Sequence, residues 1–549
     1  MDEKDARALD QAKSTEFTTQ HELSNVETAS SKHLSGDDSD SFQVNREAEK
    51  KLVRKLDLTL LPLFTLIYAC NFIDRTAIGN ARIAGLEKDL DMHGFDFNIA
   101  LTTFYISYIV SEIPSNLALK RFGSIWIAFL VISFGAVAIG SAFVKSFGSL
   151  LATRVLLGLA EGGTLVSLMA IGILIAQELA HALHTKSGLV YILARYYRRH
   201  ELVLRVGIFF GLSPTLAGAF GGLLASGLLS VSDIGELQRW RKIFFIEGII
   251  TLGFGVLLLF FMPADPTVTR LFNAEERNLA IARIDADQVV KTGGRKEPTS
   301  LKLVLRSFNF NTVLCTISYI MINISFQGLS LFLPTVINTC AWLFKIILTV
   351  DPMLRKSNTI DLFLATVEAQ LRTVPPYLAG AVWALFCAWS GYRIKQRCIP
   401  IIYSVLLMVI GYSIAISTKN SHARYAACFL SVAGGSPSGP MYLTWATDNS
   451  APDTMRAVTT AVIPGLGQLG SVIAVWTYLP ADAPDFHKGN TLNLVTSVLA
   501  CFLTALGGFY IRWENRKRER GERDYRLEGK SQEEVEQLGY LHPQFRYQL

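Results

Sequence analysis

Four charged side chains stand inside or directly beside long apolar runs of this sequence. Asp74 and Arg75 follow the apolar segment LLPLFTLIYACNFI, and Arg154 and Glu161 lie seven residues apart in RVLLGLAEGG. Because seven residues make two turns of an α-helix, Arg154 and Glu161 are expected on one face of a helix. Ionisable groups are costly to bury in lipid, so in such places they pair with one another, face a wet cavity and serve function.

These residue types suit the coupling of a proton to an anion, because a buried carboxylic acid can exchange a proton and a guanidinium can bind a carboxylate. We predict that Asp74 and Glu161 couple protons. Arg75 and Arg154 are predicted to bind a substrate anion once protonation of an acid frees them. The structural alternative for Asp74 and Arg75 is a helix stop at the membrane surface. The alternative for Arg154 with Glu161 is a lock between helices.

The composition indicates a membrane protein. Of 549 residues, 50% are hydrophobic and 18% charged, and the mean hydropathy is +0.32. A soluble protein of this size rarely hides so much apolar surface. The formal net charge of +6 comes from short Lys and Arg clusters between apolar runs. Such clusters orient membrane helices and do not resemble a nucleic-acid surface, so we expect the lipid bilayer as a partner and no nucleic acid.

The apolar runs predict an all-α membrane protein with twelve transmembrane helices, because a bilayer core needs about 20 apolar helical residues to cross it. The predicted spans are 56–73, 97–117, 125–144, 148–165 or beyond, 205–229, 243–262, 311–337, 371–390, 399–417, 423–446, 457–478 and 491–511. Basic loops such as YRIKQR and RWENRKRERGERDYR then fall on one side, which predicts cytoplasmic termini. The Gly and Pro residues of SVAGGSPSGPMYLTW predict a bent or broken tenth span.

The polar segments divide the chain. We predict a disordered cytosolic tail at 1–50, a six-helix half at 51–263, a cytosolic linker at 264–310, a second six-helix half at 311–512 and a cytosolic tail at 513–549. A two-fold repeat of membrane helices is the architecture of a secondary transporter, whose substrate binds near the bilayer midplane between the halves.

Several ordered motifs together resemble one family. The motifs are NFIDRTAIGNARIAGLEKDL, SEIPSNLALKRFG, RVLLGLAEGG, YYRRHELVLRVGIFF, LAGAFGGLLASGL, LFLPTVIN, RTVPPYLAG and HKGNTLNL. They are similar to the major facilitator superfamily, in its fungal anion:cation symporter branch of allantoate and nicotinate permeases. The resemblance covers about residues 50–520. It implies twelve helices, alternating access and proton-coupled uptake of a small organic acid across the plasma membrane.

The resemblance also implies roles for individual residues. Asp74 and Arg75 match the D-R pair that ends the first helix in the wider branch, and Arg154 with Glu161 match its coupling and anion-binding positions on helix four. Tyr108 matches a helix-two tyrosine and is taken as a hydrogen-bonding partner of the substrate. In the seventh span, Asn323 and Gln327 offer further polar lining of a substrate path, or they could equally hold helices together.

Two segments interrupt this pattern, at 166–186 and 340–365. Their lengths are close to those of short fungal introns, and the first begins Val-Ser, as a translated intron start would. We interpret both as retained introns or errors of the gene model. The alternative makes Glu178, His181 and His184 metal ligands on one helical face. Such residues share a face by chance often enough that we predict no metal site.

The sequence thus predicts a secondary active transporter, a proton-coupled symporter of a vitamin, ureide or other small carboxylate. It is expected in the plasma membrane as a multi-pass monomer, with protons and the anion as partners and without a cofactor. No nucleophile with its base is visible, so an enzyme is not expected. Two alternatives remain: an exporter of a metabolite or drug on the same fold, and a transporter-like nutrient sensor.

Overall fold

The structure is a computed structural model that describes residues 38–122, 125–162, 197, 199–232, 235, 237, 239–262, 269, 271–280, 301–348, 366–451, 453–531, 534–535 and 538–549. The chain divides into Met1–Thr59 and Leu60–Leu549, and helix α2 crosses the boundary. The contacts given below lie within Leu60–Leu549. Within the described residues every regular element is a helix.

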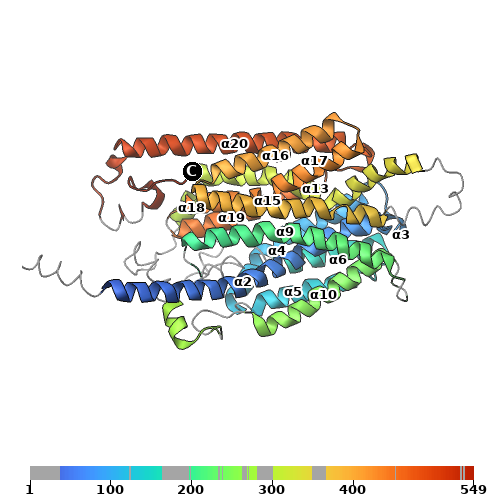
Figure 1. Cartoon of the computed structure of the whole chain (residues 1–549), viewed down its shortest axis with the longest axis horizontal. Helices are drawn as coiled ribbons and strands as arrows, with labels where there is room; N and C mark the ends of the chain where they lie inside the picture. Colours follow the sequence, from blue (N-terminus) through green and yellow to red (C-terminus); the bar gives the residue numbers. More distant parts are fainter. Residues whose placement is uncertain are drawn as a thin grey trace, which may run out of the picture. The chain divides into compact units, whose positions relative to one another are not determined.

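The described helices of the first half fall on the six spans that the sequence predicts there. They are α2 (Asp38–Ile83), α4 (Asp96–Phe122), α5 (Ile125–Ser141), α6 (Phe147–Glu161), α9 (Arg199–Ser230) and α10 (Trp240–Phe261), with the short α3 (Leu86–Asp89) after α2 (Figure 1). Helix α2 begins at Asp38, inside the segment predicted as a disordered tail, because REAEKKLVRKL consists largely of strong helix formers.

The second half also follows the predicted spans. Its helices are α12 (Leu301–Arg306), α13 (Phe310–Leu348), α15 (Val374–Ile394), α16 (Cys398–Ser417), α17 (Ser421–Gly435), α18 (Ser438–Asp448), α19 (Asp453–Ala474) and α20 (His487–Glu519), with the 3-10 turns η3 (Pro480–Asp482), η4 (Asp524–Arg526) and η5 (Gly539–Leu541). The predicted break of the tenth span is confirmed: α17 ends at Gly435, and α18 restarts after Pro437.

Six described helices are long and apolar enough on their own to cross a membrane: Glu47–Ile83, Ile208–Ser230, Trp240–Phe261, Phe310–Asn338, Cys398–Ser417 and His487–Glu519. Ile125–Ser141 and Val458–Ala474 are shorter apolar helices. The remaining predicted spans fall on α4, α6, α15, α17 and α18, which pack against the apolar helices or against one another.

The predicted interruptions are barely covered by the described residues. The first, 166–186, lies wholly outside them. Of the second, 340–365, only the backbone as far as Leu348 is described, and there it continues helix α13. The intron hypothesis therefore stays a prediction.

Glycines bring α6 very close to α4, and this contact positions the charged residues of α6. A Cβ atom at Gly158 would lie 2.4 Å from the carbonyl oxygen of Phe104, and one at Gly162 would lie 2.3 Å from that of Tyr108. Only glycine allows two helix backbones to approach so closely. The face of α6 that includes Arg154 and Glu161 is consequently buried.

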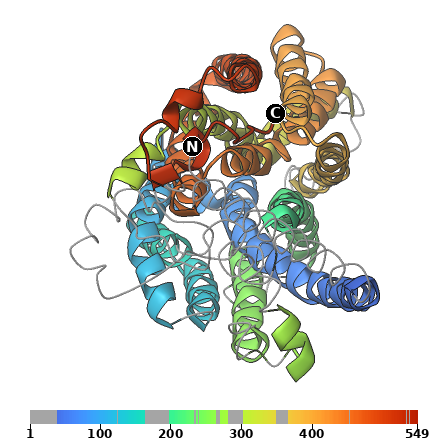
Figure 2. The ribbon, with the colours of Figure 1, turned by 90° about the vertical axis from the view of Figure 1, so that its left-hand side faces the viewer.

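Helices pack mainly within their own half. In the first half α5 packs along α10 and α4 along α6, and in the second half α13 packs on α19 and α20 while α16 packs on α17 and α20. Contact between the halves is made chiefly by α9 with α15, which lie side by side in Figures 1 and 2, and by α4 with α19.

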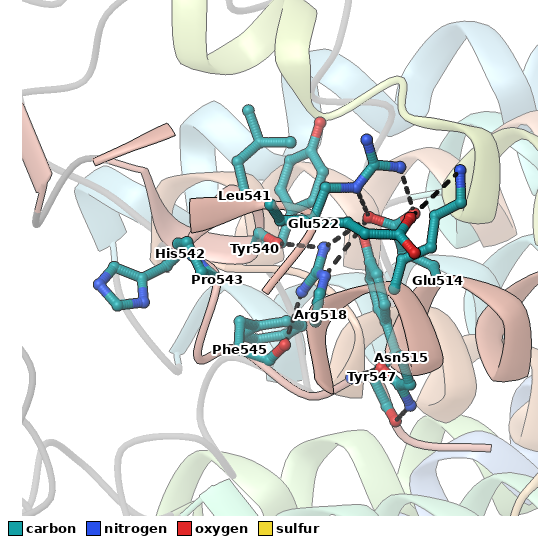
Figure 3. A network of polar contacts seen from close by, with 12 residues as sticks. Glu514, Asn515, Arg518, Glu522, Tyr540, Leu541, His542, Pro543, Phe545 and Tyr547 are labelled. Carbon is teal, nitrogen blue, oxygen red and sulfur yellow. Dashed lines mark hydrogen bonds and ion pairs between the residues drawn. The ribbon is translucent and has the colours of Figure 1, made fainter. Parts of the chain in front are cut away.

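The C-terminal residues fold back onto the second half (Figure 3). Arg518 of α20 is buried and donates to the carbonyl oxygens of Phe545 at 2.6 Å and Tyr540 at 3.0 Å. Asn515 exchanges two hydrogen bonds with the backbone of Tyr547. Asn449, which follows α18, exchanges two hydrogen bonds with the backbone of Gln548. Residues 538–549, which we call the C-terminal strap, thereby join the ends of α18 and α20.

Candidate functional site

Arg75 and Glu161 form a buried ion pair between α2 and α6. Arg75 Nε donates to Glu161 Oε2 at 2.9 Å, and the exposed side-chain fractions are 2% and 0%. The amide of Asn71, one turn before Arg75, donates to the same oxygen at 3.1 Å. Removing either partner of such a buried pair would leave an uncompensated charge, so each residue stabilises the other.

Arg154 and Glu161 share the buried face of α6, as the seven-residue spacing predicts, but no hydrogen bond joins them among the described contacts. Seven residues span about 10 Å along a helix, which is too far for direct pairing. Arg75 of the neighbouring helix takes the place beside Glu161 instead. Asp74 is also buried, at 3% exposure, and α2 continues past it to Ile83, so the helix does not stop at Asp74.

Tyr108 lies against Arg75. Its ring centroid is 4.5 Å from the Arg75 guanidinium carbon, and the ring of Phe104, one turn earlier on α4, is 5.7 Å away. The face of an aromatic ring attracts a cation. Tyr108 therefore orients Arg75, and its role towards a substrate stays a prediction.

Arg154 is held differently. Its guanidinium carbon is 5.1 Å from the ring centroid of Phe244 on α10, and the side chain is fully buried. Its Nε and Nη2 have no hydrogen-bond partner among the described residues, and neither has Asp74 Oδ2. Buried donors without an acceptor cost about 1–3 kcal/mol each, so this group is suited to receive a ligand's oxygens or water.

The sequence analysis missed one buried carboxyl group of the first half, that of Glu247. It lies on α10, one turn after Phe244, and only 1% of it is exposed. Both of its carboxyl oxygens lack a hydrogen-bond partner among the described residues. A lone carboxylate inside the apolar run IFFIEGIITL was the available signal. It was overlooked because no basic residue shares its face of that run.

Asn323 and Gln327 are buried on α13. Asn323 Nδ2 donates to the Gly467 carbonyl at 2.8 Å and to Ser471 Oγ at 3.2 Å, both on α19. For Asn323, this contact matches the predicted alternative in which the residue holds helices together, and the role of Gln327 stays a prediction. The structure thus brings Arg75, Tyr108 and Glu161 into contact. Asp74 and Arg154 are buried on the same two helices, α2 and α6, and the described hydrogen bonds of Asn323 lead elsewhere.

In the described part of the chain no group of three or more His, Cys, Asp or Glu residues is placed to hold a metal ion. Glu178, His181 and His184 lie outside that part.

The two halves meet at the C-terminal end of α2. Asn98 on α4 donates to the Val475 carbonyl at 2.6 Å, and Trp476 Nε1 donates to Thr102 Oγ1 at 3.1 Å. The Arg82 guanidinium carbon lies 4.3 Å from the Phe97 ring centroid and 5.6 Å from that of Phe332 on α13. We call Arg82, Asn98, Phe332 and Val475 the end closure.

Comparison with known proteins agrees with this architecture. The model of the Major Facilitator Superfamily matches residues 64–475. An uncharacterized transporter of Schizosaccharomyces pombe is 29% identical over 87% of this chain and 86% of its own length. The MFS-type transporter efuF of Hormonema carpetanum is 28% identical over 85% of this chain and 86% of its own length. The major facilitator-type transporter hxnP of Emericella nidulans is 26% identical over 92% of this chain and 94% of its own length.

Solved structures share the fold at low identity. The proton:xylose symporter XylE matches with a TM-score of 0.55 and 16% identity, over 81% of this chain and 94% of its own. A bacterial homolog of the human lysosomal transporter Spinster, in an inward-facing conformation, matches with a TM-score of 0.54 and 15% identity. The match covers 82% of this chain and 96% of that homolog.

Proposed function

Because the chain belongs to the Major Facilitator Superfamily, we propose that it is a secondary active transporter that moves a small organic anion together with protons. The family match and the named relatives support transport across a membrane. The observation that supports an anionic substrate concerns Arg154. It is a buried guanidinium whose Nε and Nη2 lack partners among the described residues. A carboxylate could accept from both nitrogens, a geometry that Arg favours.

Protons act on the ion pair of Arg75 and Glu161. As a carboxylate, Glu161 accepts hydrogen bonds from Arg75 and Asn71 through one oxygen. Adding a proton to Glu161 removes its negative charge, so its hold on Arg75 weakens and α2 can move relative to α6. Asp74, next to Arg75, provides the second proton-coupling carboxyl of the proposal. Alternating access then follows from rearrangement of the two halves around this site.

The substrate class, direction and membrane are also proposals. The motifs quoted above support the anion:cation symporter branch and a vitamin, ureide or other carboxylate as substrate. The basic loops on one side support cytoplasmic termini, and import across the plasma membrane by a monomer is the arrangement we propose. The end closure would then lie on the outer side.

The test is uptake into proteoliposomes by the full chain and by a form that lacks 166–186 and 340–365. Nicotinate, allantoate, pantothenate and galactonate serve as probe anions at several pH values, with and without an imposed proton gradient. We expect accumulation of one probe that depends on the gradient. Transport of that probe with equal accumulation when the gradient is collapsed would contradict proton coupling.

A further inference from the structure

Helix α20 exposes one continuous apolar face along most of its length. Val495, Phe502 and Phe509 follow one another at seven-residue steps and are 56%, 62% and 70% exposed. Because seven residues make two turns, these side chains form one stripe, which faces lipid on a membrane-spanning helix. The helix rises about 33 Å from His487 to Phe509, close to the thickness of a bilayer core, about 30 Å. The turns after Phe509 therefore lie at the level of the lipid headgroups.

The same face of α20 changes its chemistry after Phe509. Arg512, Trp513 and Arg516 follow Phe509 at steps of three, four and seven residues, which is the spacing of one helical face. All three side chains are exposed, Trp513 to 44%. Trp is typical of the boundary between hydrocarbon and water. The apolar stripe thus ends in an aromatic ring that is flanked along the helix by two guanidinium groups.

The acids of α20 do not neutralise these two arginines. Glu514 is buried, and its Oε1 accepts a hydrogen bond from Arg518 at 3.4 Å beside the C-terminal strap (Figure 3). Glu519 lies further along the helix than Arg516, away from the apolar stripe. Neither Arg512 nor Arg516 makes an ion pair with another described residue. Their positive charges are therefore available to a partner outside the protein.

The loop between α15 and α16 adds two cations at the same end of the second half. Cys398, the first residue of α16, donates its thiol to the Thr504 carbonyl of α20 at 3.5 Å. Its sulfur would also lie 2.7 Å from a Cβ atom at Gly508, one turn before the basic turns of α20. Arg393 and Lys395 stand just before Cys398 in the chain and are exposed. Within the described part of the chain they too make no ion pair.

We propose that Arg512 and Arg516, together with Arg393 and Lys395, bind the headgroups of anionic phospholipids. We call these four residues the basic rim. The proposal goes beyond the proposed function and does not depend on it. A lipid is the anion that fits this face, because its acyl chains can cover the apolar stripe while its phosphate lies at the level of Trp513. Clusters of Lys and Arg directly beside a membrane helix attract anionic lipids in this way.

The test is native mass spectrometry of the purified full chain in detergent, titrated with phosphatidylserine or with phosphatidylcholine of the same acyl chains. We expect tighter binding of phosphatidylserine, and a preference that decreases as salt is added. Arg512→Gln with Arg516→Gln should reduce this preference about tenfold or more, since one cation near an anionic lipid surface contributes about fivefold. Arg512→Lys with Arg516→Lys should keep the preference, because both charges remain.

A second double variant tests the loop. Arg393→Gln with Lys395→Asn should also lower the preference for phosphatidylserine, and Asn suits the positive φ of 55° at position 395. Lys419→Gln is the matched control. Lys419 is 90% exposed and follows the last turn of α16, at the opposite end of that helix from Cys398. Its loss should leave the preference unchanged.

Equal affinity of the wild type for both lipids, or an undiminished preference in either double variant that removes charge, would overturn the proposal. Glycerophosphoserine, the headgroup without acyl chains, is the competitor. Displacement of the lipid by an equal concentration of this compound would show a site for a soluble anion and would overturn it as well. If the α20 variant fails to fold, the wild type and the loop variant decide. Failure of transport would count against the proposed function alone, because lipid binding is measured without transport.

Discussion

The guanidinium of Arg75 is bonded to Glu161 at 2.9 Å, although these residues are 86 positions apart, whereas Arg154 on the same helix as Glu161 makes no described hydrogen bond to it. The two arginines therefore have different surroundings, and in the proposed mechanism they have different tasks. Arg75 is engaged in an ion pair that protons would loosen, and Arg154 would present its donors, which lack partners among the described residues, to an incoming anion. The predictions below separate these tasks.

Glu161→Gln should abolish proton-driven accumulation while leaving exchange of a labelled probe anion across the membrane. The amide keeps the shape of the carboxyl and still accepts from Arg75, but it cannot gain or lose a proton. Glu161→Ala should in addition destabilise the fold by about 3–5 kcal/mol, because Arg75 loses its buried partner. Accumulation and counterflow measured in the same proteoliposomes give the comparison, and full accumulation by Glu161→Gln would refute its coupling role.

Arg154→Lys should weaken anion binding about tenfold, because an ammonium cannot replace two parallel guanidinium hydrogen bonds and this costs about 1.4 kcal/mol. The apparent KM for the transported probe anion is the measurement. Arg372→Lys is the matched control, since Arg372 is a half-exposed residue paired with Glu368 at the start of the eighth span. An unchanged KM in Arg154→Lys would count against a substrate role.

Gly79→Ala should open the end closure. A Cβ atom there would lie 2.5 Å from the Leu331 carbonyl oxygen on α13, so the two halves could not approach as they do here. Hydrogen exchange of backbone amides at 96–102 and 474–478 should become faster. Gly140→Ala provides the control, because a Cβ atom at Gly140 meets nothing within 4 Å. Equal exchange in both variants would show that the closure does not depend on this contact.

Arg518→Ala should lower the melting temperature of the purified protein by several degrees. Its side chain is 1% exposed and bonds two carbonyl oxygens of the C-terminal strap as well as Glu514. Loss of hydrogen bonds to a buried charge costs about 1.5–3 kcal/mol each. Arg520→Ala should have little effect, since Arg520 is 70% exposed. Equal melting temperatures of the Arg518→Ala and Arg520→Ala proteins would show that the C-terminal strap adds no stability.

Removal of 166–186 and 340–365 should raise the yield of folded protein in membranes and permit transport. The flanking motifs then join as they do in the resembled family. Sequencing of cDNA across both junctions is the direct check. Transcripts that retain all of these codons, together with equal transport by the longer chain, would exclude the intron hypothesis.

The sequence by itself determined the helices, because a membrane span must satisfy its own backbone within an apolar run of sufficient length. The break at Pro437 was likewise visible as local Gly and Pro chemistry. Only the tertiary structure decided which charges meet. Glycines at 158 and 162 bring α6 against α4, and Arg75 rather than Arg154 reaches Glu161. Pairing depends on distances between helices, which spacing along one helix cannot give.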